Sequence, residues 1–400
     1  MSSQMRPIEV AITGIGALCN LGNDWQQIVA SPAEDSKNFV PWPESSERPS
    51  EKAWIAPIAA PSAEKYLPQR QLRALDRFLI MSVCAVGQAL EFAKLDPSDT
   101  SKKEELGLIF GTSRPEFGGF QRFASPVLEK QLQKINPGHF PLLARNAAAG
   151  QAAITFGLKG YSNTLAVNHV SGIHAIMRAA DLIRLGRCRS MLAGGVECLS
   201  RLSLGHSLSY YKNHLDQTDP RFLGNQPGLV VPAEGVCVVV LEELNHALER
   251  GAQPLALIKE QEFGRSLDSG SYAKCCQQVW SRQETNRCAW VSISASGGNM
   301  PHDQIESEAL ATLWNGPDYA PPISALKAWT GETEAAGSAF QVAESAWVLA
   351  GHSPLRPPLR PQGSRLKEAS LQQSGPSWSF LSSRDPFGNH ALMTLAPASN

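Results

Sequence analysis

The chain has 400 residues, 42% of them hydrophobic, which is enough to bury a large core as two domains or as one duplicated fold. Its 36 basic and 37 acidic residues nearly cancel, so no long-range field favours nucleic acid or an anionic membrane surface as a partner. No apolar stretch reaches the roughly 18 to 20 residues of a membrane span, and the eight cysteines include no CxxC pair. We therefore expect a cytoplasmic protein with mostly buried, reduced thiols.

Short apolar segments alternate with segments of helical periodicity along the first 250 residues. Strands are expected at 10–16, 105–111, 164–168, 191–195 and 236–242, and helices at 74–94, 146–154 and 173–185. This alternation predicts an α/β fold with a largely parallel sheet that helices cover on both faces.

The same alternation returns more weakly after residue 251. It predicts strands at 290–295, 323–326 and 390–395 and a helix at 332–349. The stretch 351–377 is rich in Pro, Ser, Gln and Arg, can bury little, and is expected to be a surface connection. We thus expect two similar halves, 1–250 and 251–400, with this connection inside the second.

A glycine pattern near the N-terminus invites comparison with a dinucleotide-binding loop. Gly14 and Gly16 close the first predicted strand, and Gly22 follows it. Their spacing fits such a loop poorly, and no acidic residue ends a second strand about 20 residues further on. A tight turn is the better interpretation.

A histidine and two acidic residues at 302–306 could supply metal ligands from one helical turn. They are His302, Asp303 and Glu306. Nothing nearby in the sequence supplies the second histidine and the open geometry of a zinc site, and side-chain pairs of this kind are usually solvated. We expect no metal site and no bound cofactor.

The segment around His169 joins a predicted buried strand to a predicted helix. This arrangement aims one side chain and the N-terminus of the helix at a bound group. His169 therefore stands where a nucleophile would be needed. Taken alone, a histidine at such a turn is more often a hydrogen-bonded structural residue than a catalyst.

Motifs along essentially the whole chain resemble those of the β-ketoacyl synthases of the thiolase superfamily. They are Val10–Ala17 with 21–23, Leu106–Thr112, Asn146–Gly150 with Gly157–Gly160, Ile183–Arg187, Met191–Glu197, Glu234 with Gly235, Lys327, and Phe387 with Gly388. The resemblance implies a thiolase-like fold, with two similar halves in a five-layered αβαβα arrangement.

The resemblance also assigns the positions where active members carry their catalytic groups. Those enzymes use an elbow cysteine to take an acyl group from an acyl carrier protein, and two histidines to decarboxylate the malonyl extender. Here the three positions hold His169, Ser296 and Glu332. Ser296 is uncharged, and a carboxylate at Glu332 would repel the charge that develops on an enolate. Because the lost groups act as a unit, we expect no functional catalytic residue.

Lys327 is the one catalytic position that is retained. In active members this lysine orients the catalytic groups, but a lysine can equally be kept for packing or for an internal ion pair. Glu332 is close in sequence, and a buried unpaired charge would be costly. We favour the structural explanation.

A full-length synthase fold without the cysteine resembles the chain-length factors of type II polyketide systems, of aromatic-polyketide or aryl-polyene type. The resemblance implies a heterodimer, or a higher assembly, with a catalytic ketosynthase. This chain would be the inactive subunit and would form one wall of the tunnel in which the acyl chain grows. The acyl carrier protein would be a second partner, and its phosphopantetheine would act through the ketosynthase.

In that family the segment around residue 120 comes near the dimer interface and the tunnel. We therefore expect tunnel or interface residues among Phe117, Phe120, Phe123 and Leu128. Ordinary core or interface packing explains these side chains about equally well.

Two other functions stay open. The protein could be a decarboxylating or acyl-transferring enzyme that uses His169 in altered chemistry. Relatives of that kind resemble active enzymes at the two histidine motifs, and this chain does not. A structural homodimer that serves as a docking platform for a carrier protein is also compatible with the sequence.

Overall fold

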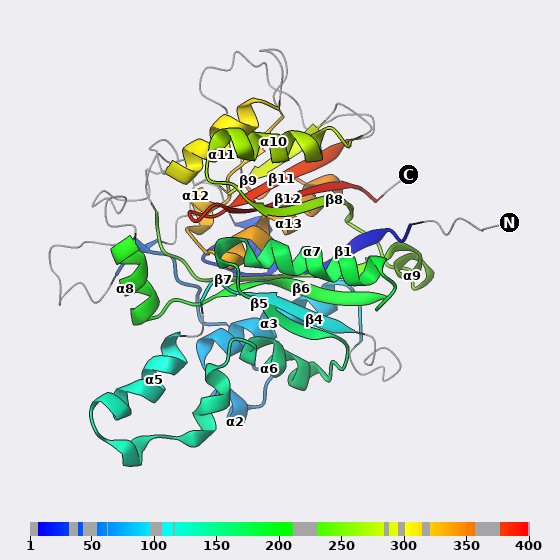
Figure 1. Ribbon diagram of the computed structural model, residues 1–400. Helices are drawn as coiled ribbons and strands as arrows, with labels where there is room; N and C mark the ends of the chain where they lie inside the picture. The colour runs from blue at the N-terminus through cyan, green and yellow to red at the C-terminus, as the bar shows by residue number, and fades with distance from the viewer. Residues whose placement is uncertain are drawn as a thin grey trace.

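The computed structural model describes residues 7–31, 39–42, 54–61, 63–96, 106–114, 117–210, 230–283, 288–294, 301–313, 321–356 and 377–398. Within these residues a mixed ten-stranded sheet is covered by helices (Figure 1). None of the described helices is long and apolar enough to cross a membrane. All eight cysteines are free, and five are buried.

The strands of the large sheet are β1 (Val10–Leu18), β4 (Gly107–Gly111), β5 (Ser162–Leu165), β6 (Ser190–Glu197), β7 (Gly235–Glu243), β8 (Ala256–Arg265), β9 (Cys288–Ile293), β10 (Ile323–Ser324), β11 (Trp378–Arg384) and β12 (Asn389–Pro397). A separate small sheet pairs β2 (Val40–Pro41) with β3 (Trp54–Ile55).

The α-helices are α1 (Trp25–Ala30), α2 (Gln69–Leu72), α3 (Arg77–Phe92), α5 (Phe117–Leu128), α6 (Ala147–Phe156), α7 (Ser171–Arg184), α8 (Arg201–Tyr210), α9 (Leu244–Glu249), α10 (Ser269–Trp280), α11 (Pro301–Ala311), α12 (Lys327–Thr330) and α13 (Ala335–Leu349). Short 3₁₀ turns form η2 (Leu132–Lys134), η3 (Pro137–Leu143) and η4 (Asn168–Val170).

The order of the strands repeats within the large sheet. The first five strands along the chain lie in the order β5-β4-β6-β7-β1, and the last five lie in the matching order β10-β9-β11-β12-β8. In each half the first two pairings of that order are parallel and the last two are antiparallel. The halves join where β1 pairs with β8 at 10–12. The prediction of two similar halves is confirmed, whereas a domain boundary near residue 250 stays a prediction.

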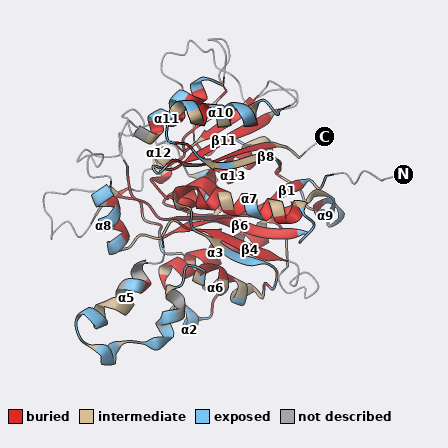
Figure 2. Cartoon of the chain, in the orientation of Figure 1, coloured by how far each residue is buried: buried red, intermediate tan, exposed pale blue. Residues whose placement is uncertain are grey.

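Five layers follow from this duplication (Figure 1). Helices α7 and α13 lie between the two half-sheets, α3 and α6 cover the outer face of the first, and α10 and α11 cover the outer face of the second. Small residues make the central layer possible: α13 is buried from Ala335 to Ala346 and contains mostly Ala, Gly and Ser, so that both sheets can approach it. Figure 2 shows the buried residues concentrated in the sheets and in this central layer.

The expectation of a largely parallel sheet was wrong. Five of the nine strand pairings in the large sheet are antiparallel. A continuous apolar run indicates that a strand is buried on both faces, but it does not indicate the direction of the strand. In this fold helices cover the antiparallel strands in the same way as the parallel ones. Of the predicted surface connection at 351–377, residues 357–376 lie outside the described part of the chain.

Candidate functional site

The predicted elbow is present between β5 and α7. Asn168 has a backbone φ of +55°, a conformation that asparagine tolerates better than most residues, and it turns the chain sharply before α7 begins. The hydroxyl of Ser171 accepts a hydrogen bond from the Val167 amide at 2.8 Å and donates to the Thr112 carbonyl at 3.2 Å. These contacts fix the turn, which places His169 in the interior with 8% of its surface exposed.

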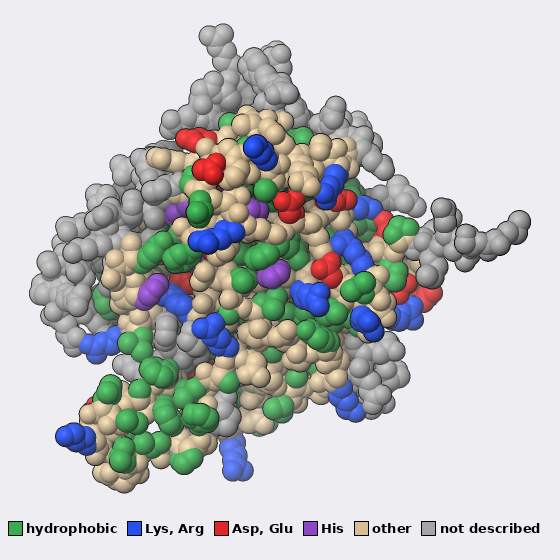
Figure 3. Space-filling model, viewed as in Figure 1, with side chains coloured by type: hydrophobic (Ala, Val, Ile, Leu, Met, Phe, Trp, Pro, Cys, Tyr) green, Lys and Arg blue, Asp and Glu red, His purple; other side chains and the backbone are tan. Residues whose placement is uncertain are grey.

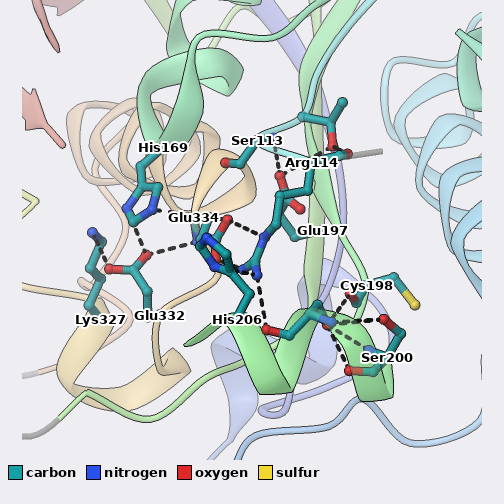
Figure 4. A network of polar contacts seen from close by, with 12 residues as sticks. Ser113, Arg114, His169, Glu197, Cys198, Ser200, His206, Lys327, Glu332 and Glu334 are labelled. Atoms are coloured by element: carbon teal, nitrogen blue, oxygen red, sulfur yellow. Dashed lines mark hydrogen bonds and ion pairs between the residues drawn. The ribbon is translucent and has the colours of Figure 1, made fainter. Parts of the chain in front are cut away.

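Two carboxylates face the ring of His169 (Figure 4). Its Nδ1 lies 3.7 Å from Glu332 Oε1 and its Nε2 lies 4.0 Å from Glu334 Oε2. Burial lowers the pKa of His169 to about 3, although Glu332 acts in the opposite direction. The imidazole is therefore neutral at neutral pH, and its contacts with the carboxylates are not ion pairs.

The backbone holds Glu332 in place beside the elbow. Its amide donates to the Val231 carbonyl at 2.7 Å, and its carbonyl accepts from the Ala233 amide at 3.1 Å. Gly331 has a φ of +74°, and a Cβ atom there would lie 2.7 Å from the Val231 oxygen. Glycine thus allows two chain segments to meet closely at the residue that carries the carboxylate.

Lys327 forms the internal ion pair that the sequence predicted. Its Nζ lies 2.7 Å from Glu332 Oε2, and both side chains are 8% exposed. Burial disfavours the charged form of each group, but the pairing outweighs it: the pKa of Lys327 is raised and that of Glu332 is lowered. Both partners are charged, and the other oxygen of Glu332 accepts from the Glu334 amide at 2.8 Å.

A second ion pair, between a buried glutamate and a partly buried arginine, lies on the other side of the site. Arg114, just beyond β4, forms an ion pair with Glu334 and donates from Nε to Glu334 Oε2 at 3.0 Å. One guanidinium nitrogen also donates to the Ser203 carbonyl at 3.0 Å and lies 3.4 Å from His206 Nδ1. Arg114, Glu334 and His206 are far from His169 in sequence and match no motif of their own, so sequence reasoning missed them.

A further buried carboxylate lies next to Arg114. Glu197 accepts from the Thr112 hydroxyl at 3.2 Å and from the Ser113 amide. Burial raises the pKa of Glu197 to about 7, although Arg114 lowers it. This group can gain or lose a proton near neutral pH.

The acidic residues of α11 are not solvated, contrary to the expectation from sequence. Asp303 and Glu306 are 3% and 1% exposed. The carboxylate of Glu306 accepts hydrogen bonds from Ser294 and Ser382, and His302 Nε2 lies 3.4 Å from Asp303 Oδ1. The charges of this group act on the site, since those of Asp303 and Glu306 raise the pKa of Lys327. Ser296 lies outside the described residues.

The four candidate tunnel or interface residues lie on α5, which projects from the body together with η2 and η3 (Figure 1). Phe120 is 50% exposed and Leu128 81% exposed, whereas Phe123 is partly buried against Phe140 with ring centroids 5.9 Å apart. The side chain of Phe117 is outside the described part of the structure. Whether any of the four lines a tunnel stays a prediction.

The exposed apolar side chains of this projection form a patch, which we call the arm. It consists of Phe120, Val127, Leu128, Leu132 and Phe140, each at least 43% exposed. Figure 3 shows hydrophobic side chains gathered over this projection at the lower left of the molecule. Exposed apolar patches of this kind are typical of surfaces that contact proteins, membranes or ligands.

Nucleophilic catalysis at the elbow is poorly served by these groups. A neutral imidazole replaces a thiolate, and the cations that could stabilise an oxyanion, Lys327 and Arg114, are already paired with Glu332 and Glu334. The carboxylates of Glu332 and Glu334 lie close to the His169 ring, where they would oppose negative charge developing beside it. Each of these cations is paired with a carboxylate, and no unpaired cation is present among the side chains described around His169.

Comparisons with known proteins agree with this fold. A family model described as the N-terminal domain of beta-ketoacyl synthase matches residues 8–247. The 3-oxoacyl-[acyl-carrier-protein] synthase 2 of Synechocystis sp. is 26% identical over 80% of this chain and 80% of its own. The solved ishigamide ketosynthase/chain length factor has a TM-score of 0.83 at 18% identity, covering 98% of this chain and 100% of that one. The ketosynthase AntDE, solved with the type II acyl carrier protein AntF, gives 0.79 at 19% identity and the same coverage.

Proposed function

Since this chain belongs to the β-ketoacyl synthase family, we propose that it is a non-catalytic chain-length factor. In this role it pairs with a catalytic ketosynthase and shapes the tunnel that limits the acyl chain carried by an acyl carrier protein. The observation that carries the proposal is the site around His169, where a neutral imidazole and the Lys327–Glu332 ion pair stand at three positions that the family resemblance assigns to catalytic groups, with the Arg114–Glu334 ion pair beside them.

The charges argue against the alternative of a decarboxylase that uses His169. Loss of carbon dioxide from a malonyl group leaves an enolate, which needs hydrogen-bond donors or cations at its oxygen. The carboxylates of Glu332 and Glu334 face the ring instead. A neutral imidazole alone supplies at most one donor, and no described contact in the site favours this chemistry.

The exposed arm supports a protein partner. Its apolar side chains lie on a projection outside the main body, where they bury little against the rest of the chain. A stable complex needs such a patch, with large apolar and aromatic side chains near its centre. The names of two structural neighbours, a ketosynthase/chain length factor and a ketosynthase bound to an acyl carrier protein, make a ketosynthase and a carrier protein the partners to test first.

Co-expression with a catalytic type II ketosynthase from the same source tests the pairing. We expect a stable 1:1 complex that buries well over ~2,000 Å² of largely apolar surface, since obligate assemblies fall in that class. Enlarging or truncating the side chain of Phe120 should then shift the length of the product. Separate elution of the two chains on size exclusion would contradict the proposal, and an unchanged product would remove Phe120 from the tunnel.

A further inference from the structure

Three potential metal ligands meet on the outer face of the second half-sheet, beneath α10. They are Glu262 on β8, Cys275 on α10 and His390 on β12, and one ligand atom of each lies within 4.8 Å of the other two. The antiparallel register explains why the two strand residues share a face. His390 is opposite Gly264, two residues along β8 from Glu262, and residues two apart on a strand point the same way. Helix α10 packs on this face and adds the thiol.

His390 is buried without a well-formed hydrogen bond to either nitrogen of its ring among the described residues. It is 1% exposed, and neither Nδ1 nor Nε2 meets hydrogen-bond geometry with a described residue. The backbone of Gly388 interacts with the ring, but without the geometry of a well-formed hydrogen bond. A buried imidazole whose two nitrogens lack well-formed hydrogen bonds can accept a further partner.

The sheet leaves room for this ring at Gly264. A Cβ atom at that position would lie 2.9 Å from His390 Nε2, so any larger residue would push the imidazole aside. On the other side the ring packs against Tyr272, with centroids 5.0 Å apart. The imidazole is therefore fixed by its neighbours on β8 and α10.

The thiol of Cys275 and the carboxylate of Glu262 complete the group. Both residues are partly exposed, which gives an ion a path from solvent, and the thiol hydrogen-bonds the carboxylate. A cation bound between the two would displace the thiol proton, because metals bind the thiolate form of cysteine.

We propose that Glu262, Cys275 and His390 bind a divalent transition metal, with Zn²⁺ as the expected ion. Mixed sulfur, nitrogen and carboxylate oxygen ligands suit zinc, and three protein ligands leave a fourth tetrahedral position for water. Zinc bonds of about 2.0–2.3 Å place ligand atoms roughly 3.5 Å apart, so the widest separation closes by about 1 Å on binding. The bound ion ties α10 to β8 and β12. This site is independent of the function proposed for the elbow.

Cobalt is the probe of choice, because Co²⁺ takes the same tetrahedral sites and a bound thiolate gives an ultraviolet charge-transfer band. Titration of the reduced full chain with Co²⁺ should produce this band with one equivalent bound, and Zn²⁺ should abolish it by displacement. Cys275→Ser should lose the band. The matched control is Cys188→Ser, which removes another partly exposed thiol, on the connection between α7 and β6, and should retain the band.

Two variants keep the sulfur and test the geometry, and they decide the question if Cys275→Ser fails to fold. Glu262→Gln and Gly264→Ala should each weaken Co²⁺ binding at least tenfold, the first by removing an anionic ligand and the second by displacing the imidazole. Zn²⁺ should raise the melting temperature of the wild type and not that of the variants. No band in the wild type, a band that persists in Cys275→Ser, or equal affinity in Glu262→Gln and Gly264→Ala would overturn the site.

Discussion

The elbow site and the exposed arm differ in how their interactions are satisfied. Around His169, charged groups are buried and each cation has an anionic partner within the chain. On the arm, apolar side chains are exposed and most of their surface meets solvent in the single chain. The charged groups of the site are thus satisfied within the chain, whereas the apolar side chains of the arm stay uncovered. This is the distribution expected of a subunit that acts through its interface.

The first way to break this comparison is to remove the cation of the buried Lys327–Glu332 ion pair and, as a control, the cation of an exposed ion pair that lies outside both regions. Lys327→Met should lower the free energy of unfolding by about 3–5 kcal/mol, because it leaves Glu332 charged and buried. The matched control is Lys65→Met, since Lys65 and Glu91 have the same 2.7 Å separation but are 66% and 47% exposed. That change should cost less than about 1 kcal/mol.

Urea unfolding at neutral pH measures both effects. The double variant Lys327→Met with Glu332→Leu should recover most of the loss, since no unpaired charge stays in the interior. If Lys327→Met costs no more than Lys65→Met, the site is not the buried, charge-compensated region described above.

Lowering the pH is a second test, because it should destabilise the buried site through His169. His169 has a pKa of about 3 in the folded chain and roughly 6.5 when unfolded. Between these values the unfolded chain binds a proton that the folded chain does not, so stability falls as the pH falls below about 6.5. From pH 8 to pH 5 this group should remove about 2 kcal/mol from the free energy of unfolding.

His169→Gln lacks the titrating ring and isolates this contribution. The difference in unfolding free energy between wild type and His169→Gln should change by about 2 kcal/mol over the same interval, in the direction that favours the variant at pH 5. A difference that does not depend on pH would show that the imidazole is protonated equally in both states.

The arm should respond in the opposite way, through binding and not through folding. Phe120→Asp should weaken the complex with the ketosynthase at least tenfold, about 1.4 kcal/mol, because it places a charge in the apolar patch. The free energy of unfolding of the single chain should stay within about 0.5 kcal/mol of the wild type, since half of this side chain is exposed. Titration calorimetry and urea unfolding separate the two quantities.

Leu248→Asp is the control for a change of the same kind elsewhere. Leu248 is 55% exposed on α9, which Figure 1 places on the other side of the molecule from α5. The Leu248→Asp variant should bind the ketosynthase as tightly as the wild type does. Equal weakening by both variants would mean that the arm is not the specific interface.

The sequence predicted the strands well where a continuous segment of the chain is buried. The apolar segments at 10–16, 191–195 and 236–242 lie within β1, β6 and β7. Strand β8 was missed because its middle reads Lys-Glu-Gln-Glu at 259–262, and one of its faces carries polar side chains. Strand direction could not be read at all, since burial on both faces gives the same apolar pattern in parallel and antiparallel strands.

The residues of the candidate site were likewise predicted only in part. Motif positions gave His169, Glu332 and Lys327, and the short sequence separation of the last two predicted their ion pair. Arg114 and Glu334 were missed because their pairing depends on how the end of β4 and the start of α13 meet in the folded chain. The metal ligands proposed under α10 are likewise joined only by strand register and helix packing.

Reconstitution with malonyl-loaded acyl carrier protein tests the central claim most directly. The chain alone should release carbon dioxide no faster than carrier protein without enzyme, whereas the chain with its ketosynthase should make product. In that pair, His169→Ala should leave the rate of product formation within about twofold, provided that the complex forms, because a neutral ring flanked by two carboxylates supplies no catalytic group. Enzymatic release of carbon dioxide by the chain alone, abolished by His169→Ala, would contradict the account.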